Sequence, residues 1–117
     1  MFICLACGVT AAAQGNTPAY PVRPIRIIVP TAAGGPTDIT PRAIGQRLTA
    51  VWGQPIVVDC RPGAGGIIAH ELAAKATPDG YTLIFSTPAG LIINPLMTKV
   101  SYDPFRDFAP VSLGSIN

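Results

Sequence analysis

The chain has 117 residues, enough for one domain, and 49% of them are apolar while only 12% are charged. A composition this apolar excludes an intrinsically disordered segment. The formal net charge of +2 is too small, and the arginines are too dispersed, to indicate binding to nucleic acid or to an anionic membrane surface. Thirteen prolines and twelve glycines predict many turns, so the helices and strands between them are expected to be short.

The first 13 residues differ from the rest of the chain. Residues 1–9 are an apolar run, and small residues follow at 10–13, which is the pattern of a secretory signal peptide cleaved after Ala13. The signal is incomplete because it lacks a positively charged start, and the alternative is an apolar terminus without a targeting role. No apolar run approaches the roughly 20 residues of a membrane span. We therefore expect a periplasmic protein in which polar residues 14–24 lead into the folded part.

Cysteine and histidine are too few to indicate a metal site. Cys4 and Cys7 lie inside the predicted signal, so Cys60 alone would remain in the mature chain, near a strand end. One cysteine and one histidine cannot complete a zinc site. The sequence therefore predicts no metal and no cofactor.

The first predicted element is a strand over residues 25–29, which are mostly β-branched and are bounded by prolines. A turn over residues 32–36 follows, and a helix then runs to residues 52–53. The apolar face of this helix is formed by three residues at i, i+4 and i+7 spacing, namely Ile44, Leu48 and Val51.

The start of this helix stays open between two positions. Thr37 and Asp38 carry capping side chains directly after the turn. Pro41, however, fits only the first turn of a helix, because proline lacks an N–H and clashes with the preceding turn. Thr40 is therefore the alternative N-cap, with Asp38 left in the loop.

The same order of elements then repeats. A strand over residues 56–58 precedes a glycine-rich turn over 61–66 and a second helix, and a third strand covers residues 81–85. The second helix places its apolar face at Ile68, Leu72 and Ala76.

The last part of the chain is predicted less regularly. A short helical segment is expected over residues 91–97, a turn over 103–107, and the beginning of a fourth strand over 108–113. Strands that alternate with helices indicate an α/β fold with a partial doubly wound, mainly parallel sheet. Three or four strands with two helices leave one helical face uncovered, so we expect the chain to be truncated.

In a sheet of this kind, ligands bind outside the carboxyl ends of the strands. Three loops leave those ends, at residues 31–38, 61–66 and 86–90, and they are rich in glycine and hydroxyl side chains. Glycine lets backbone N–H groups approach a ligand, and helix N-termini favour anions, so the loops suit a carboxylate. The alternative is that they are tight turns only. A phosphate site is not indicated, because neither glycine-rich turn matches G-x-G-x-x-G or precedes Gly-Lys-Ser/Thr.

No residue pattern indicates catalysis. His70 lies within a predicted helix and is expected to be a surface side chain rather than a base. Ser86 lies outside a nucleophile-elbow motif, and Asp38 and Asp59 do not form a carboxylate pair. Arg61 either clamps a carboxylate with two hydrogen bonds or forms a salt bridge that shapes its loop. The sequence therefore predicts a protein that is not an enzyme.

Six segments after residue 19 carry motifs that are recognisable together. They are YPVRPIRIIVP (20–30), AGGPTD (33–38), GQPIVVD (53–59), RPGAGG (61–66), TPDGYTL (77–83) and YDPFRDFAPVSL (102–113). With these motifs in this order and spacing, the chain resembles the Bug-type periplasmic solute-binding proteins of tripartite tricarboxylate transport.

The resemblance implies a two-lobed receptor, similar to type II periplasmic binding proteins, that closes around a small organic carboxylate. Residues 25–117 would be part of its first lobe, and the second lobe would be absent. A membrane permease or a sensor protein would receive the loaded receptor, and no nucleic acid is implied. The ligand-binding residues implied by the matching loops are Thr31, Ala33, Gly34, Gly35, Thr37, Asp38, Arg61, Gly63, Ala64, Gly65, Ser86, Thr87 and Asn94.

Several positions depart from the family pattern. Thr31 stands where Phe is common, Cys60 stands where Asn is usual, and Pro41 and His70 replace small or apolar helical residues. Together with the expected truncation, these departures keep open a second hypothesis, a non-functional remnant too short to fold stably. A third hypothesis, the nucleotide-binding domain of an enzyme, lacks both a phosphate motif and an acid–base pair.

Overall fold

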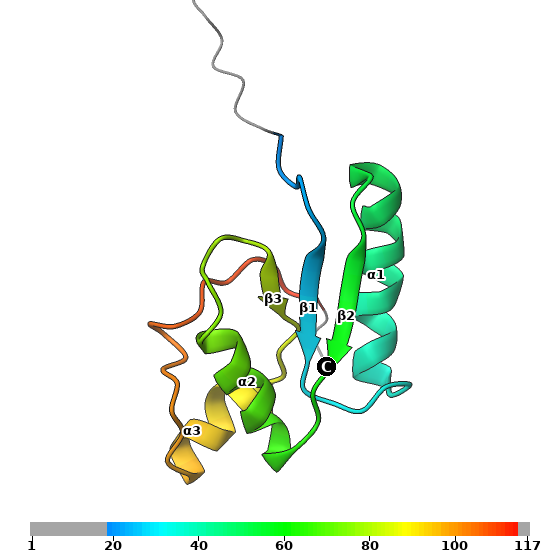
Figure 1. The fold of residues 1–117 in the computed structure, drawn as a ribbon. Coiled ribbons are helices and arrows are strands. Elements are labelled where there is room, and N and C mark those ends of the chain that lie inside the picture. The colour runs from blue at the N-terminus through cyan, green and yellow to red at the C-terminus, as the bar shows by residue number, and fades with distance from the viewer. Residues whose placement is uncertain (1–18, 115–117) are drawn as a thin grey trace, which may run out of the picture.

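The computed structural model describes residues 19–114, so the predicted signal peptide lies outside the described residues. Three parallel strands form one sheet, with helices beside it (Figure 1). In chain order the elements are β1 (Ile25–Val29), α1 (Pro36–Trp52), β2 (Ile56–Cys60), η1 (Ala64–Gly66), α2 (Ile67–Ala74), β3 (Thr82–Ile84), η2 (Ala89–Ile93) and α3 (Asn94–Met97). The predicted α/β fold with a parallel sheet is confirmed.

Strand β1 lies at the centre of the sheet, whose strand order is β2-β1-β3. Ile25 pairs with Ile56 of β2, and Arg26 pairs with Thr82 of β3. From β1 the chain passes to β2 on one side of the sheet, and it then crosses back past β1 to β3 on the other side. With right-handed crossovers, this reversal places α1 and α2 on opposite faces of the sheet. Figure 1 shows α1 beside β2, while α2 lies toward β3.

The core is built on β1 because this strand has a neighbour on each side and a helix on each face. Ile25, Ile28 and Val29 are fully buried. A strand buried on both faces reads as a continuous apolar run, which explains the sequence IRIIV. The strand predicted at residues 25–29 is confirmed with the same bounds.

Helix α1 begins earlier than either predicted N-cap. Gly35 is the N-cap, with an extended backbone, and Pro36 occupies the first helical position, where a missing N–H costs nothing. The predictions that Thr40 caps the helix and that Pro41 lies in its first turn are wrong. Pro41 lies inside the helix and is fully buried, and it removes one backbone hydrogen bond of the helix because proline has no N–H.

The apolar residues predicted to form the core-facing sides of the two helices do not face the core. Ile44 and Val51 of α1 are 41% and 78% exposed, while Leu48 is half-buried. Ile68 and Leu72 of α2 are also exposed, and Ala76 lies beyond the end of that helix. The buried residues are instead Asp38, Pro41 and Gly45 of α1, and Ala69 and His70 of α2, and Gly45 lies against Ile56 of β2. Small side chains let a helix approach the sheet closely: a Cβ on Gly45 would lie 3.1 Å from the Ile56 side chain.

The predicted fourth strand is wrong. Residues 108–114 contain no strand, although the predicted turn over 103–107 is present and is closed by a hydrogen bond from Asp107 N–H to Asp103 O. The ring of Phe108 packs edge-on against Tyr102 and His70 instead. Burial of this aromatic ring replaces strand pairing as the contact that holds the segment.

Candidate functional site

The three predicted ligand loops leave the same edge of the sheet, because all three parallel strands end there (Figure 1). The N–H of Arg61 donates to the carbonyl of Val29 at 2.8 Å, which joins the ends of β1 and β2. Gly66 touches Pro30, where a Cβ would lie 3.1 Å from the proline ring. The chain reverses its direction across the sheet between β1 and β3, and ligands of doubly wound sheets bind at such a point.

Asp38 anchors the loop that follows β1. It is only 2% exposed, and its Oδ2 accepts hydrogen bonds from the backbone N–H of Gly34 and from Arg42 Nε, both at 2.8 Å. The Cys60 thiol donates to its Oδ1 at 3.2 Å. The bonds from Arg42 and Gly34 lower the pKa of Asp38 to about 2. Asp38 is therefore ionised, and its hydrogen bonds connect this loop to α1 and to the end of β2.

The loop between β2 and α2 has an unusual backbone. Residues 63–66 all have positive φ angles, including Ala64 at 47°. At Gly63, with φ 136°, a Cβ would also lie 2.6 Å from the Ile68 side chain, so only glycine fits. The side chain of Asn94 donates to the carbonyl of Gly65 at 2.9 Å. This bond brings the predicted site residue Asn94, which begins α3, to the second glycine loop.

Arg61 forms the salt bridge that was one of its two predicted roles. Its Nε lies 2.9 Å from Asp59 Oδ1, and Asp59 is also held by Arg26 of β1. Burial raises the pKa of Asp59, but the hydrogen bonds from Arg26 and Arg61 outweigh that effect and lower it. Within residues 19–114, the two Nη groups of Arg61 have no hydrogen-bond partner. The guanidinium is therefore oriented and still has donors to offer.

The predicted site residues also carry backbone donors that nothing in the described part of the chain accepts. Hydrogen bonds within residues 19–114 leave the backbone N–H groups of Ala33, Gly35, Thr37, Ala64, Gly65, Ser86 and Thr87 without an acceptor. Beside them, Thr31 Oγ1 is buried and is the one buried side-chain oxygen or nitrogen of these residues without a partner. Buried polar groups in proteins are nearly always paired, so Thr31 Oγ1 is the group at this edge for which a further partner is expected.

His70 is fully buried, and the prediction that it lies on the surface is wrong. Its Nδ1 lies 2.7 Å from the carbonyl of Gly66, and its Nε2 lies 2.7 Å from Ser86 Oγ. Burial lowers the pKa of His70, and the bond to Gly66 opposes that shift. His70 therefore connects two of the predicted ligand loops.

The space for this buried ring comes from small neighbours and aromatic partners. The ring stacks on Tyr102 with centroids 5.4 Å apart. A Cβ on Gly90 would overlap the ring, and the Tyr102 hydroxyl donates to the carbonyl of Gly90 at 2.5 Å. The sequence signal that could have revealed this arrangement is weak, because glycines at 66 and 90 lie far apart in the chain.

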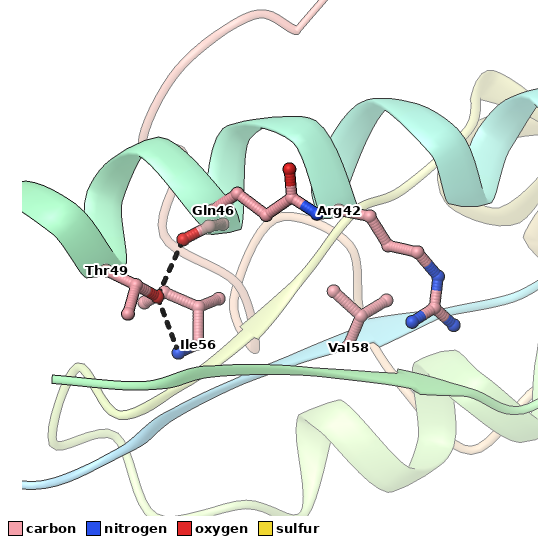
Figure 2. A pocket seen from close by; sticks show the side chains of 6 residues that line it. Arg42, Gln46, Thr49, Ile56 and Val58 are labelled. Atoms are coloured by element: carbon pink, nitrogen blue, oxygen red, sulfur yellow. Dashed lines mark hydrogen bonds between the residues drawn. The ribbon is translucent and has the colours of Figure 1, made fainter.

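A separate hollow of ≈ 320 Å³ lies between α1 and β2, and it contains none of the predicted ligand-binding residues (Figure 2). Thr49 closes one end, where its hydroxyl donates to the carbonyl of Gly45 at 2.8 Å and accepts from the N–H of Ile56 at 3.2 Å. The hollow is lined by Arg42, Gly45, Gln46, Thr49, Ile56 and Val58. Because Thr49 is satisfied within the protein, it gives this hollow no free polar group.

Metal-ligating side chains are scattered in the part of the chain that the structure describes. Within residues 19–114, no three His, Cys, Asp or Glu side chains cluster in a way that could hold a metal ion. No helix in that range is long and apolar enough to cross a membrane.

A parallel α/β sheet with unpaired donors at its carboxyl edge is typical of a domain that binds a small anionic solute. Comparison with known families identifies the family of this domain. Residues 41–115 match the tripartite tricarboxylate transporter family receptor. The chain belongs to this family, and the predicted resemblance is confirmed. The matched family consists of receptors. The prediction of a binding protein rather than an enzyme is therefore confirmed for the family to which the chain belongs.

Curated relatives agree with this assignment. A UPF0065 protein of Bordetella bronchiseptica is 45% identical over 102 residues, which cover 86% of this chain and 30% of the relative. Protein BugT of Bordetella pertussis is 42% identical over 108 residues, which cover 91% of this chain and 32% of the relative. The chain thus spans about a third of the length of these relatives.

Solved structures show the same fold. A structure described as a periplasmic transporter superposes with a TM-score of 0.70 at 48% identity, covering 74% of this chain and 29% of that one. MatC from Rhodopseudomonas palustris with bound malate gives 0.66 at 40% identity, covering 79% and 32%. A second R. palustris protein, Rpa4515 with adipate, gives 0.58 at 43% identity, covering 60% and 23%. The α/β fold of this chain is therefore shared with part of these longer proteins.

Proposed function

We propose that the protein is a periplasmic receptor that binds a small organic carboxylate at the carboxyl edge of its sheet. The family assignment supports a solute receptor, and two structural neighbours were solved with the dicarboxylates malate and adipate. In this proposal residues 25–117 contribute part of the first lobe, and the thirteen proposed site residues form one wall of the cleft.

The electrostatic character of the loops supports an anionic ligand. Seven unpaired backbone N–H groups and the free Nη groups of Arg61 are donors, and donors to a carboxylate make charge-assisted hydrogen bonds. The one carboxylate buried among the loops, Asp38, already has hydrogen-bond donors on both oxygens. We therefore assign Asp38 an indirect role, in which it holds the loop that offers the N–H groups of Gly35 and Thr37.

The observation that carries the proposal is the unpartnered hydroxyl of Thr31. Leaving a buried polar group unpaired costs about 1–3 kcal/mol, so a group retained in this state is expected to gain its partner when the ligand binds. Thr31 directly follows Pro30, which touches the second glycine loop at Gly66. The hydroxyl therefore lies where two of the donor-rich loops approach each other.

A pair of threonine substitutions tests this proposal. Thr31→Val removes the hydroxyl and keeps the shape, so we expect weaker binding of malate or adipate in calorimetric titration, by roughly tenfold, with unchanged or raised stability. Thr49→Val removes a hydroxyl that is fully bonded inside the protein, so we expect lower stability with unchanged affinity. If neither acid binds at millimolar concentration, the receptor function is contradicted. If Thr31→Val binds as tightly as the unmodified chain, the ligand lies elsewhere.

Export and transport partners complete the proposal. We infer that residues 1–13 direct the chain to the periplasm, and that the loaded receptor delivers its ligand to the permease of a tripartite tricarboxylate-type transporter or to a sensor protein. A fusion of the chain to a phosphatase that is active only in the periplasm is expected to be active, and deletion of residues 1–13 is expected to abolish that activity. Activity that survives the deletion would contradict the export role.

A further inference from the structure

His70 controls more than the packing of α2, because its two ring nitrogens face two different loops of the proposed site. The Nδ1 atom lies 2.7 Å from the carbonyl oxygen of Gly66, at the end of the second glycine loop. The Nε2 atom lies 2.7 Å from the hydroxyl of Ser86, in the loop that follows β3. The ring is fully buried, so water does not compete for either nitrogen.

The chemistry of these partners determines where the protons lie. A carbonyl oxygen only accepts, so Nδ1 must carry the ring proton of neutral His70. The Nε2 lone pair is then an acceptor, and the Ser86 hydroxyl must donate to it. The other acceptor within reach of this hydroxyl is the carbonyl of Thr87, at 3.2 Å. While His70 is neutral, Ser86 therefore offers only lone pairs to the cleft and cannot donate to a carboxylate.

We propose that His70 is a positioning residue that sets the hydrogen-bonding direction of Ser86, so that protonation of His70 and carboxylate binding strengthen each other. This inference rests on the proposed function of the same site. In the protonated ring both nitrogens donate, Nε2–H bonds to the Ser86 oxygen, and the hydroxyl proton of Ser86 is released. That proton then points either to the Thr87 carbonyl or to a bound carboxylate.

The coupling between protonation and carboxylate binding is assigned to His70 rather than to the groups around its ring. Burial raises the pKa of the Tyr102 phenol, which stacks on the ring, so this group stays neutral. Glu71, the next residue on α2, accepts a hydrogen bond from the Ser101 hydroxyl. The other residues that contact the ring are uncharged, namely Gly66, Ser86, Gly90 and Phe108.

The linkage is reciprocal, which makes it measurable at either end. If protonated His70 favours the bound carboxylate, then the bound carboxylate must raise the pKa of His70 by the same free energy. Because the chain has a single histidine, the ring signals in an NMR titration need no assignment among several residues.

The experiment is an NMR titration of the histidine ring in the intact chain, with and without saturating adipate. We expect the Nδ1–H tautomer at neutral pH, and a titration midpoint that rises when adipate binds. In the Ser86→Ala variant we expect no such rise, because alanine has no proton to redirect. Calorimetry should then show adipate binding that tightens roughly threefold or more from about pH 8 to about pH 6 in the unmodified chain only.

Three outcomes separate the inference from the function on which it rests. An Nε2–H tautomer overturns the assigned hydrogen-bond directions without reference to any ligand. Adipate that binds without raising the midpoint, or that raises it equally in Ser86→Ala, overturns the linkage and leaves the receptor function standing. A chain that binds neither adipate nor malate removes the proposed function, and the linkage with it.

Discussion

The two ends of the sheet are built from the same three strands and are held together in different ways. At the carboxyl edge, buried side chains join the loops: Asp38 ties Gly34 to Cys60, and His70 ties Gly66 to Ser86. These internal bonds use the side chains and leave the neighbouring backbone N–H groups of the loops unpaired.

At the amino edge, exposed side chains join the segments before β1 and β3. The Tyr20 hydroxyl donates to the carbonyl of Gly80 at 2.5 Å, and Arg23 pairs with Asp79 while lying 4.0 Å from the centroid of the Tyr81 ring. Most of these side chains are exposed to solvent. The comparison teaches that the two edges differ in the burial of the side chains that join their loops: Asp38 and His70 are buried, whereas Arg23 is exposed. Four predictions test that difference.

The largest effect is expected from Gly90→Ala. The added Cβ would overlap the ring of His70, and overpacking of this kind costs about 3 kcal/mol. Removing the ring should relieve the overlap, so the double variant with His70→Ala is expected to lose less stability than the sum of the two single variants. Urea denaturation of the four proteins measures this coupling. Strict additivity would show that the ring does not lie against Gly90.

Asp38→Asn is expected to have the next largest effect, because the new amide would direct donors at the Gly34 N–H or at Arg42. The pKa of the carboxyl is about 2 when folded and about 3.8 when unfolded. Its stabilising contribution is therefore present above pH 3.8 and is lost as pH falls toward 2. Denaturation at neutral and at strongly acid pH should show a gap between the two proteins that closes in acid. A gap independent of pH would contradict this assignment.

A smaller effect is expected from the titration of His70. Burial holds its pKa below the ordinary value of 6.5, so the unfolded chain takes up a proton first as pH falls. The free energy of unfolding should therefore decrease as pH falls below about 6.5, until the folded ring is protonated too. His70→Phe, which keeps a ring of similar size, is expected to remove this slope. Unfolding curves at several pH values check both statements, and an unchanged slope in the variant would refute them.

The smallest effect is expected at the amino edge. Arg23→Ala removes an exposed cation–π contact with Tyr81 and an exposed salt bridge with Asp79, and exposed interactions of either kind contribute at most about 1 kcal/mol. We expect a correspondingly small shift in the urea midpoint and no change in adipate affinity, because Arg23 lies at the opposite end of the strands from the proposed site. A loss of affinity in this variant would show that the two edges are coupled.

The elements that sequence reasoning located correctly share one physical property. The strands predicted at residues 25–29, 56–58 and 81–85 are found at Ile25–Val29, Ile56–Cys60 and Thr82–Ile84. The signal for each is a short apolar run close to a proline or glycine, and this local signal does not depend on the rest of the fold. Helix α1 ends at Trp52 with Gly53 in the left-handed C-cap, as the glycine indicates. The carboxyl-edge loops follow from the order of strands and helices along the chain, so sequence alone was enough to select their residues.

The helix faces could not be selected in the same way. The periodic residues Ile44 and Val51 form a stripe, but periodicity does not say on which side of a helix the sheet lies. Gly45 faces the sheet because the lack of a side chain allows close approach, and this advantage exists only once the partner Ile56 is in place.

The sequence by itself therefore determined the strands, the parallel α/β class, the family and the donor-rich loops, since these depend on local propensity and on motifs of contiguous residues. Only the tertiary structure decided that His70 is buried, that Asp38 serves the fold through both oxygens, and that the hydroxyl of Thr31 has no partner within the described residues. Whether a polar group is satisfied depends on atoms that the fold brings from distant positions, such as Ser86 and Cys60. That long-range pairing leaves no local pattern in the chain.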